Sequence, residues 1–423
     1  MYDSSFNKFT LAKTLRKEDF FAYPSLKDEI YRAVIISKAV ASASTCFNGH
    51  DPLVSFSKKG KTIYKIQAFE DELVLRKANE NLRKATQTKQ QNRDSIIKNL
   101  IHLLSEGVPY RIYRLDIKSF YESFSSDYIK KELDSLVKLN PNSKKLIEHL
   151  LAKYTSIGGL GLPRGLALSA TLSELLMSEF DKEVRNKSGV YFYARYVDDI
   201  LIITNGLENC TLFIKDIKLA LPIGLGLNSN KQKIRTAQER VDPLATVHPS
   251  VTVLEFDYLG YKFKVTEPYK VGSGKKPSAY FRNVDVDISL NKIKKIKSRI
   301  SRTFHDFSKT KDFSLLTQRI KYLTTNYRLK ELGSNKYRLA GIYYSYPLLS
   351  SSTGKGLQEL EHYLKNSIYS KFGRIFSKTS ALLSAKEKKE LLGNSFIYGY
   401  KTKCMVHFHP KKMNKIQECW ANE

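Results

Sequence analysis

Alternation of apolar and polar residues marks several short segments of the chain and predicts strands. It is clearest at 61–66 (KTIYKI) and at 110–117 (YRIYRLDI), where isoleucine and tyrosine are frequent. Two further segments, 193–203 (YARYVDDILII) and 256–265 (FDYLGYKFKV), each predict a hairpin of two strands. Most of the predicted strands therefore lie in the middle of the chain.

Apolar residues repeat at helical spacing over longer segments between and around these strands. The helical segments are 67–105, in which Thr86 and Asn92 are candidate breaks, 126–154, 166–184, 209–221 and most of the chain after about residue 286. A loop rich in glycine and proline, 158–165 (GGLGLPRG), precedes the third of them. This order of elements predicts an α+β core followed by an all-α lobe.

The charge of the chain points to a polyanionic partner. Its 423 residues include 71 Lys+Arg against 42 Asp+Glu, a formal net charge of +29. Nucleic acid and anionic membrane are the two candidates. No apolar run is long enough for a spanning helix, and the first residues lack the apolar core of a signal peptide, so we expect nucleic acid and no membrane.

The cysteines are few and widely spaced. The chain has four, at Cys46, Cys210, Cys404 and Cys419, and none forms a CxxC pair. We therefore expect neither a zinc site nor a disulfide framework, and a reducing cytoplasm as the compartment.

Asp198 and Asp199 are adjacent charges inside an otherwise apolar hairpin. Burying two like charges costs several kcal/mol per ion unless a counter-charge is present. A hairpin tip can face a cleft, and Mg²⁺ is a natural counter-charge because it prefers carboxylate oxygens. Asp116, at the end of the strand 110–117, is the best further ligand. The alternatives are a solvated turn for Asp198–Asp199 and a helix N-cap for Asp116.

Three carboxylates meeting in this way could hold two divalent ions roughly 4 Å apart, the arrangement used for phosphoryl transfer. Five blocks with this cluster at their centre resemble a reverse transcriptase, in the order of that family. They are RLDIKSFYESF (114–124), GLPRGLALS (161–169), YVDD (196–199), LGLNSNKQKI (225–234) and FDYLGYKF (256–263). Together the blocks cover roughly residues 110–265.

The resemblance implies a role for each matching residue. Asp116 and Asp198, with Asp199 beside them and the main-chain carbonyl of Ile117, would bind two Mg²⁺ ions, with Mn²⁺ as a possible substitute. Tyr121 would be the aromatic gate that clashes with a ribose 2′-OH, its alternative being plain core packing. Lys233 would meet the leaving pyrophosphate, its alternative being a solvated surface lysine.

Other residues are expected to contact nucleotide or nucleic acid. Arg164 stands where the family usually has glutamine, and with Gly165 it would lie beside nucleotide or template. Arg93, in a segment that resembles a helical fingers segment, is predicted to contact the triphosphate. The primer grip would comprise Tyr258, Leu259 and Gly260. A basic helix that follows would lie along the duplex and bind it through Lys292, Lys295, Arg299 and Arg302.

The fold class implied is α+β: a right-hand polymerase with an RRM-like antiparallel palm sheet, helical fingers and an all-α thumb and C-terminal region. The expected parts are 1–109 (N-terminal extension and fingers), 110–270 (palm with inserted fingers elements), 271–340 (thumb) and 341–423 (helical C-terminal region).

The expected function is RNA-directed DNA synthesis. The segments 287–307 and 316–329 most resemble the defence-associated reverse transcriptases of bacteria, which implies a cytoplasmic anti-phage role. The expected partners are dNTPs, a DNA primer or product, and an RNA template that is a dedicated non-coding RNA. The oligomeric state stays open. The alternatives are template-independent DNA synthesis, a two-metal nuclease and a non-catalytic RNA-binding scaffold.

Overall fold

The protein folds as two compact units in this computed structural model. The structure describes residues 2–58, 60–238, 251–271, 279–330, 337–408 and 410–421. The first unit comprises mainly Met1–Asn92 and Pro109–Thr236, and the second comprises Arg93–Val108, Ala237–Glu331 and Lys336–Glu423. Each unit is described by itself.

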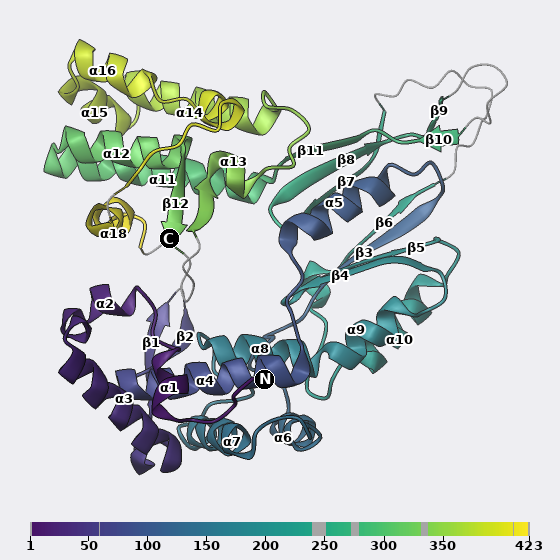
Figure 1. Ribbon diagram of the computed structural model, residues 1–423. Helices are drawn as coiled ribbons and strands as arrows, with labels where there is room; N and C mark the ends of the chain where they lie inside the picture. The colour runs from purple at the N-terminus through teal and green to yellow at the C-terminus, as the bar shows by residue number, and fades with distance from the viewer. Residues whose placement is uncertain are drawn as a thin grey trace. The chain divides into compact units, whose positions relative to one another are not determined.

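A four-stranded sheet is the centre of the first unit. Its strands, in the order β4-β5-β3-β6, are β4 (Val190–Tyr196), β5 (Asp199–Thr204), β3 (Tyr110–Asp116) and β6 (Lys233–Ala237). β5 pairs antiparallel with both β3 and β4, which confirms the predicted strand and hairpin. Ile200, Leu201, Ile202 and Ile203 are all fully buried, as expected for a central strand covered on both faces. The helices α9 (Ser178–Arg185) and α10 (Cys210–Ala220) lie along this sheet in Figure 1.

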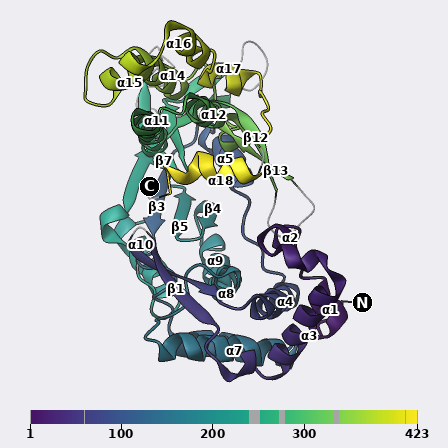
Figure 2. The same cartoon turned by 90° about the vertical axis from the view of Figure 1, so that its left-hand side faces the viewer.

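Helices from the N-terminal part of the chain form the rest of the first unit. Figure 1 and Figure 2 both show α3, α4 and α7 close together. The helices are α1 (Lys8–Ala12), α2 (Asp19–Ala22), α3 (Glu29–Ser44), α4 (Phe69–Thr86), α6 (Ser126–Asp134), α7 (Pro141–Ser156) and α8 (Ala167–Leu176), with short 3-10 turns at Pro24–Lys27, Phe47–Gly49 and Ser229–Lys231. Leu73, Val74, Ala78 and Leu82 of α4 are buried at the spacing of one helix face.

A two-stranded hairpin also belongs to the first unit. Its strands are β1 (Leu53–Lys58) and β2 (Lys61–Ile66), paired antiparallel along their whole length. The prediction of a strand at 61–66 is confirmed. Its partner β1 was not predicted, because only Leu53 of this strand is buried and no alternating pattern results.

The predicted long helices are divided in the structure. Residues 126–154 form α6 and α7, because Asn140 caps α7 and Pro141 stands at its first position. Residues 166–184 form α8 and α9, which meet at Met177. Residues 67–105 form α4 and, in the second unit, α5 (Arg93–Leu104).

The second unit combines a small sheet with packed helices. The sheet has the order β11-β8-β7, with strands β7 (Thr252–Tyr258), β8 (Tyr261–Thr266) and β11 (Val284–Ile288), and β9 (Tyr269–Val271) pairs with β10 (Ala279–Phe281). Figure 2 shows α11, α12 and α14 grouped together. The helices are α11 (Leu290–Thr310), α12 (Phe313–Thr324), α13 (Ile342–Ser345), α14 (Lys355–Tyr369), α15 (Phe376–Leu382), α16 (Ala385–Leu392), α17 (Phe396–Lys401) and α18 (Pro410–Glu418).

The predicted helical character of the chain after residue 286 holds with one exception. β12 (Asn326–Lys330) and β13 (Tyr337–Gly341) form an antiparallel pair within it. On α11, Ile293, Ile300 and Phe304 are buried, as the apolar stripe of this helix requires. The predicted α+β class is confirmed. Among the described helices, none has the length and apolar character needed to cross a membrane.

Candidate active site

Asp116 and Asp198–Asp199 lie side by side although they are distant in sequence. Asp116 ends β3 and is the direct register partner of Asp199, the first residue of β5. The backbone N–H of Ile117 donates to the carbonyl of Asp198 at 3.1 Å. Side chains of register partners on neighbouring strands share one face of the sheet. The sheet therefore brings the predicted carboxylates to one place.

A buried ion network supports the hairpin that carries Asp198. Arg195, which is 3% exposed, donates to both carboxylate oxygens of Asp181 at 2.7 and 2.8 Å, and to Glu174 at 2.7 Å. It also donates to the carbonyl of Val197 at 3.1 Å, where the turn adopts a positive φ of 61°. Burial works against the charged form, but the hydrogen bonds and charges of Asp181 and Glu174 raise the pKa of Arg195 above its ordinary value. Arg195 therefore holds the hairpin turn at Val197, whose positive φ is a strained backbone conformation.

Lys231 is the cation that meets Asp116. Its Nζ lies 2.9 and 3.0 Å from the two carboxylate oxygens, and Asn228 Nδ2 donates to the same carboxylate at 3.1 Å. The hydrogen bond to Asp116 is the main cause that raises the pKa of Lys231. The predicted lysine, Lys233, is exposed at the start of β6. The 3-10 turn Ser229–Lys231 thus places Lys231, not Lys233, beside Asp116, and contact of Lys233 with the leaving pyrophosphate stays a prediction.

The remaining two carboxylates are short of counter-charge. Burial is the largest cause that raises the pKa of Asp198, and the charge of Asp116 raises it further against Lys231 and Lys61. Burial likewise raises the pKa of Asp199, and its contact with Arg114 at 3.5 Å only partly opposes this. Buried like charges of this kind are a common feature of functional sites.

The carboxylates of Asp116 and Asp198 open into a cavity of ≈ 560 Å³, and Asp199 is not among the residues that line it. Asp116, Ile117 and Asp198 line it from the sheet, and Lys231 and Asn228 from the segment that follows α10. Its other walls are Gly60, Lys61, Thr62, Tyr64, Lys118, Ser119, Phe120, Glu122, Tyr154, Gly158, Gly159, Leu160 and Arg164. Such a mixed charged and apolar cavity has the size of an ordinary small-molecule site.

Lys61 is a cavity residue that the sequence did not single out. It begins β2, next to the turn of the β1–β2 hairpin, and its charge acts on Asp198. Part of the evidence for the position of Lys61 was visible in the sequence, because Lys61 is the first residue of the alternating segment KTIYKI. Without the pairing of β1, nothing in the sequence places it near the carboxylates.

Arg164 is held by an ion pair. Its Nε and Nη2 donate to the two carboxylate oxygens of Glu122 at 2.8 and 3.0 Å, and its guanidinium lies 5.3 Å from the centre of the Tyr121 ring. The positive charge of Arg164 is therefore matched by a carboxylate, and its expected place beside nucleotide or template stays a prediction. Tyr121 is half-buried under this pair, and its carbonyl accepts from the N–H of Leu162 at 2.7 Å.

Gly165 follows Arg164 at a place where a side chain does not fit. Its φ is +111°, and an added Cβ would lie 2.6 Å from the carbonyl oxygen of Tyr64. The N–H of Tyr64 donates to the carbonyl of Arg164 at 2.8 Å. The loop 158–165 is thus joined directly to β2, which explains why the two contribute to one cavity.

Arg93 lies in the second unit and is engaged there. Its Nε donates to the carbonyl of Leu259 at 2.9 Å, its Nη1 donates to the carbonyl of Ser345 at 2.8 Å, and its guanidinium stacks 4.7 Å from the centre of the Tyr261 ring. These contacts lie within its own unit, where Arg93 supports the turn of the predicted primer grip. Contact of Arg93 with the triphosphate stays a prediction.

That turn joins β7 to β8 at Tyr258, Leu259 and Gly260. Leu259 and Gly260 both have positive φ, 46° and 85°. Tyr258 is buried, so only the turn itself is available to a ligand of this unit. The role of the three residues as a primer grip stays a prediction.

The basic residues of α11 differ in their surroundings. Lys292 is exposed, and Lys295 and Arg302 are half-exposed. The guanidinium of Arg299 lies 5.5 Å from the Trp420 ring centre, and the Trp420 indole N–H donates to the Arg299 carbonyl at 3.0 Å. Arg299 therefore packs against the C-terminal region, and nucleic-acid binding by the four residues stays a prediction.

The donor set fits a hard divalent cation. In the part of the chain that the structure describes, no three side chains from His, Cys, Asp and Glu form a ready metal cluster. Asp116 and Asp198 nevertheless line one cavity, and their repulsion is of the kind that a dication relieves. Mg²⁺ commonly uses one or two carboxylates and takes its other ligands from water and substrate phosphates. A binding ion would have to share Asp116 with Lys231.

Comparison with known proteins agrees with this geometry. Residues 67–263 match the family described as reverse transcriptase (RNA-dependent DNA polymerase). Two solved telomerase structures are also similar. One is apo telomerase from Candida tropicalis truncated from the C-terminal domain (14% identity, 51% of this chain and 53% of that one, TM-score 0.33). The other is telomerase from Candida albicans with a TWJ fragment of telomeric RNA (11% identity, 78% and 63%, TM-score 0.34).

The chain spans 53% and 63% of the lengths of these two telomerase chains, and at such TM-scores we base no argument on them. The family match includes every residue brought together at the carboxylates from β3, β5 and the turn before β6. The mixture of helices and antiparallel sheets is that of a right-hand polymerase. Residues 67–263, just under half of the chain, therefore match a reverse transcriptase domain, and this match indicates an RNA-directed DNA polymerase, a nucleotidyltransferase.

Proposed function

We propose that the whole protein is an RNA-directed DNA polymerase that extends a primer along an RNA template. The observation that carries the proposal is the pairing of Asp116 with the Asp198–Asp199 hairpin at the edge of a nucleotide-sized cavity. The match of residues 67–263 to the reverse transcriptase family supports it. The net charge of +29 suits a protein that holds nucleic acid.

Reverse transcriptase domains use divalent ions, and we assign two Mg²⁺ to this site, with Mn²⁺ as a substitute. Asp116, Asp198, Asp199 and the carbonyl of Ile117 would hold them. When bound, such ions lower the pKa of the attacking 3′-OH and stabilise charge on the leaving pyrophosphate. The carboxylates need no general-base role in this scheme.

The other side chains around the cavity would bind and orient the incoming nucleotide. Lys61 and Lys231 supply positive charge beside the carboxylates, where a triphosphate requires it. Tyr121 would exclude a ribose 2′-OH, and the Arg164–Glu122 ion pair above it would hold its ring in place. Arg164 would then act through Tyr121 instead of through the template.

Primer extension tests the proposal. The purified chain should extend a DNA primer annealed to an RNA template when dNTPs and Mg²⁺ are present, and the product should be the complement of the template. The Asp198→Ala, Asp199→Ala double variant should make none. DNA of random or single-base sequence would instead establish template-independent synthesis. A wild-type protein that makes no DNA on any primer–template would refute the proposal.

We further infer an anti-phage role in bacteria, with a dedicated non-coding RNA as template. The support is the likeness of segments 287–307 and 316–329 to defence-associated reverse transcriptases. Cells that express the chain with its neighbouring genes should reduce phage plating, and the double aspartate variant should not. Sequencing of RNA bound to the immunoprecipitated protein should give one abundant non-coding species. Equal plating with wild type and variant would refute this role.

A further inference from the structure

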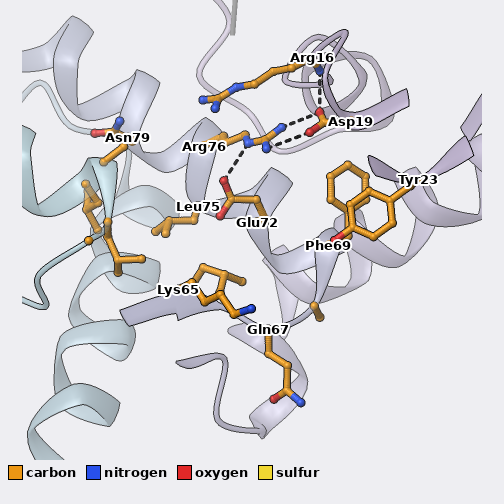
Figure 3. Close-up of a pocket in the computed structure, with 16 residues that line it drawn as sticks. Arg16, Asp19, Tyr23, Lys65, Gln67, Phe69, Glu72, Leu75, Arg76 and Asn79 are labelled. Atoms are coloured by element: carbon orange, nitrogen blue, oxygen red, sulfur yellow. Dashed lines mark hydrogen bonds and ion pairs between the residues drawn. The ribbon is translucent and has the colours of Figure 1, made fainter. Parts of the chain in front are cut away.

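A basic groove runs along α4 in the first unit, away from the carboxylates. It consists of two hollows, of ≈ 390 Å³ and ≈ 470 Å³, that share Arg16, Arg76 and Asn79. None of the residues that line these hollows lines the cavity at Asp116 and Asp198. We call this surface the α4 groove. Figure 3 shows the smaller hollow, of ≈ 390 Å³.

The charge of the α4 groove is strongly unbalanced. In its larger hollow the charged lining residues are six basic ones and a single acid, Glu80. The basic residues are Lys13, Arg16, Arg76, Arg83, Lys84 and Lys89. Glu80 is itself 3.8 Å from Lys77, which does not line the hollow. The larger hollow therefore presents an excess of positive charge, of which only the part at Arg76 is paired with carboxylates of the smaller hollow, Asp19 and Glu72.

Two arginines in the α4 groove behave differently. The guanidinium of Arg76 is held by carboxylates: it donates to both oxygens of Asp19 at 2.7 and 3.1 Å and to Glu72 at 2.8 Å. Arg16 lies beside it in Figure 3, and among the residues that the structure describes its hydrogen bond to Asp19 comes from its main-chain N–H. Burial and then the charge of Arg76 lower the pKa of Arg16, and the charges of Glu72, Asp19 and Glu18 only partly oppose this. A half-buried guanidinium without an acceptor is costly, so an anion is expected as its partner.

Asn79 provides a second indication of a ligand in the groove. Its Oδ1 is buried and has no hydrogen-bond partner among the described residues, and Asn79 lines both hollows. Phosphate oxygens cannot satisfy this atom because they only accept hydrogen bonds. Once the side chain turns toward the groove, a hydroxyl can donate to this atom, and the ribose 2′-OH is the hydroxyl that RNA has and DNA lacks.

We propose that the α4 groove is a second nucleic-acid site, which binds the phosphodiester backbone of single-stranded RNA through Arg16, Arg83 and Lys89 and a ribose hydroxyl through Asn79. The smaller hollow extends from the shared residues to Lys65 of β2 and to Gly165–Leu168 at the start of α8. A strand bound in both hollows would therefore lie along one side of the loop that forms the cavity wall. This proposal rests on the proposed function only in taking RNA as a ligand.

Equilibrium binding tests the groove without requiring catalysis. A fluorescent single-stranded RNA is titrated with full-length protein in the absence of dNTPs and divalent ions, over a series of salt concentrations. The groove variant is Arg16→Gln, Arg83→Gln, Lys89→Gln. The matched control is Lys130→Gln, Lys131→Gln, Lys138→Gln, which removes the same charge from exposed positions of the same unit that line neither hollow.

The groove variant should bind RNA about tenfold more weakly, and the slope of log Kd against log salt should fall by about 2, since each single-strand phosphate contact contributes about 0.7. In the control variant, the affinity for RNA should change by no more than about twofold, and the slope should stay close to that of the wild type. Equal losses in both variants would mean nonspecific attraction and would overturn the proposal. Thermal unfolding shows whether the groove variant is folded.

Wild-type protein gives an independent measurement that no folding defect can affect. Ultraviolet crosslinking of bound RNA followed by peptide mass spectrometry should mark the peptides that contain Arg16 or Arg83–Lys89. The wild type should also bind the RNA more tightly than DNA of the same sequence, and Asn79→Leu should remove this difference. Crosslinks confined to other peptides would overturn the site. If the groove binds RNA but the enzyme makes no DNA, the proposed function fails and the groove stands.

Discussion

At the scale of single residues, the site is marked by carboxylates that lie buried and close together. Two aspartates inside an apolar hairpin stood out in the sequence because such a placement is costly, and this is why Asp116, Asp198 and Asp199 could be predicted. Lys231 could not be separated from Lys233 in this way. Both lie in one basic segment, and only the geometry of the short turn decides which ammonium reaches Asp116.

Lys231 competes with a divalent ion for Asp116, so its removal should favour the ion. Lys231→Gln should tighten binding of Mn²⁺ to the protein by about twofold to fivefold, a modest gain because the lysine is largely exposed. Lys233→Gln removes the same charge two residues away and should leave the Mn²⁺ affinity unchanged. Electron paramagnetic resonance of free Mn²⁺ measures both. Identical affinities for the two variants would contradict the competition.

The raised pKa of Asp198 predicts a dependence of stability on pH. Burial, and then repulsion from Asp116, make the native state hold the Asp198 proton more tightly than the unfolded chain does. Stability from this group is therefore present at low pH and is lost as pH rises from the ordinary aspartate pKa, about 4, through the raised one.

Asp198→Asn removes this charge and keeps the shape of the side chain. It should raise the thermal unfolding midpoint of the metal-free protein at neutral pH by about 1 to 3 °C. The gain should disappear as the pH approaches about 4. Differential scanning fluorimetry across pH measures this gain in the unfolding midpoint. An unchanged or lower midpoint at neutral pH would show that the Asp198 charge does not destabilise the native state.

At the scale of elements, the segments with a clear period were predicted and those without one were missed. β3 and the β4–β5 hairpin alternate or are wholly apolar, and they appear as expected. β1 is mostly exposed and gave no period, so the hairpin that brings Lys61 to the cavity was not found. The break between α8 and α9 at Met177 lacks any proline or glycine that would have signalled it.

The loop 158–165 offers a matched pair of glycine substitutions. Gly165→Ala places a Cβ against the Tyr64 carbonyl and the Ile63 side chain, both 2.6 Å away, at a positive φ. Gly158→Ala imposes positive φ alone, because nothing lies within 4 Å of its Cβ. Gly158→Ala should cost about 1 kcal/mol of unfolding free energy and Gly165→Ala about 1 to 3 kcal/mol more.

Urea unfolding measures both free energies. Both variants place a side chain at a positive φ, +111° at Gly165 and +82° at Gly158, so the difference between them reports the contact of the loop with β2 together with the extra backbone strain at Gly165. If the two substitutions cost the same, the loop does not pack on β2 as described.

At the scale of the whole molecule, the sequence indicated a nucleic-acid enzyme through its motifs and its charge of +29. The expected parts, with boundaries at about residues 110, 271 and 341, follow one another along the chain, whereas each unit of the structure combines separate segments. α5 follows α4 in sequence but belongs with the β7–β8 turn, to which Arg93 donates a hydrogen bond. Long-range contacts of this kind leave no periodic signal, so the contact of Arg93 with this turn could not be predicted from the sequence.

The α4 groove was equally hidden, because its cations come from two segments that each look like an ordinary solvated face. Lys13 and Arg16 follow α1, while Arg83, Lys84 and Lys89 belong to the end of α4 and the chain after it. Only the folded first unit places them around one hollow. The family match begins at residue 67, so the contribution from Lys13 and Arg16 lies outside it.

The central claim is that Asp116 helps to hold the ions of a polymerase. The most direct measurement is the rate of a single dNTP addition to a DNA primer on an RNA template. Asp116→Asn should lower this rate by at least about a thousandfold, the scale of several kcal/mol supplied at a metal site. Asp134→Asn, the same change at an exposed carboxylate of the same unit, should leave it unchanged. An Asp116→Asn enzyme as fast as the wild type would contradict the account.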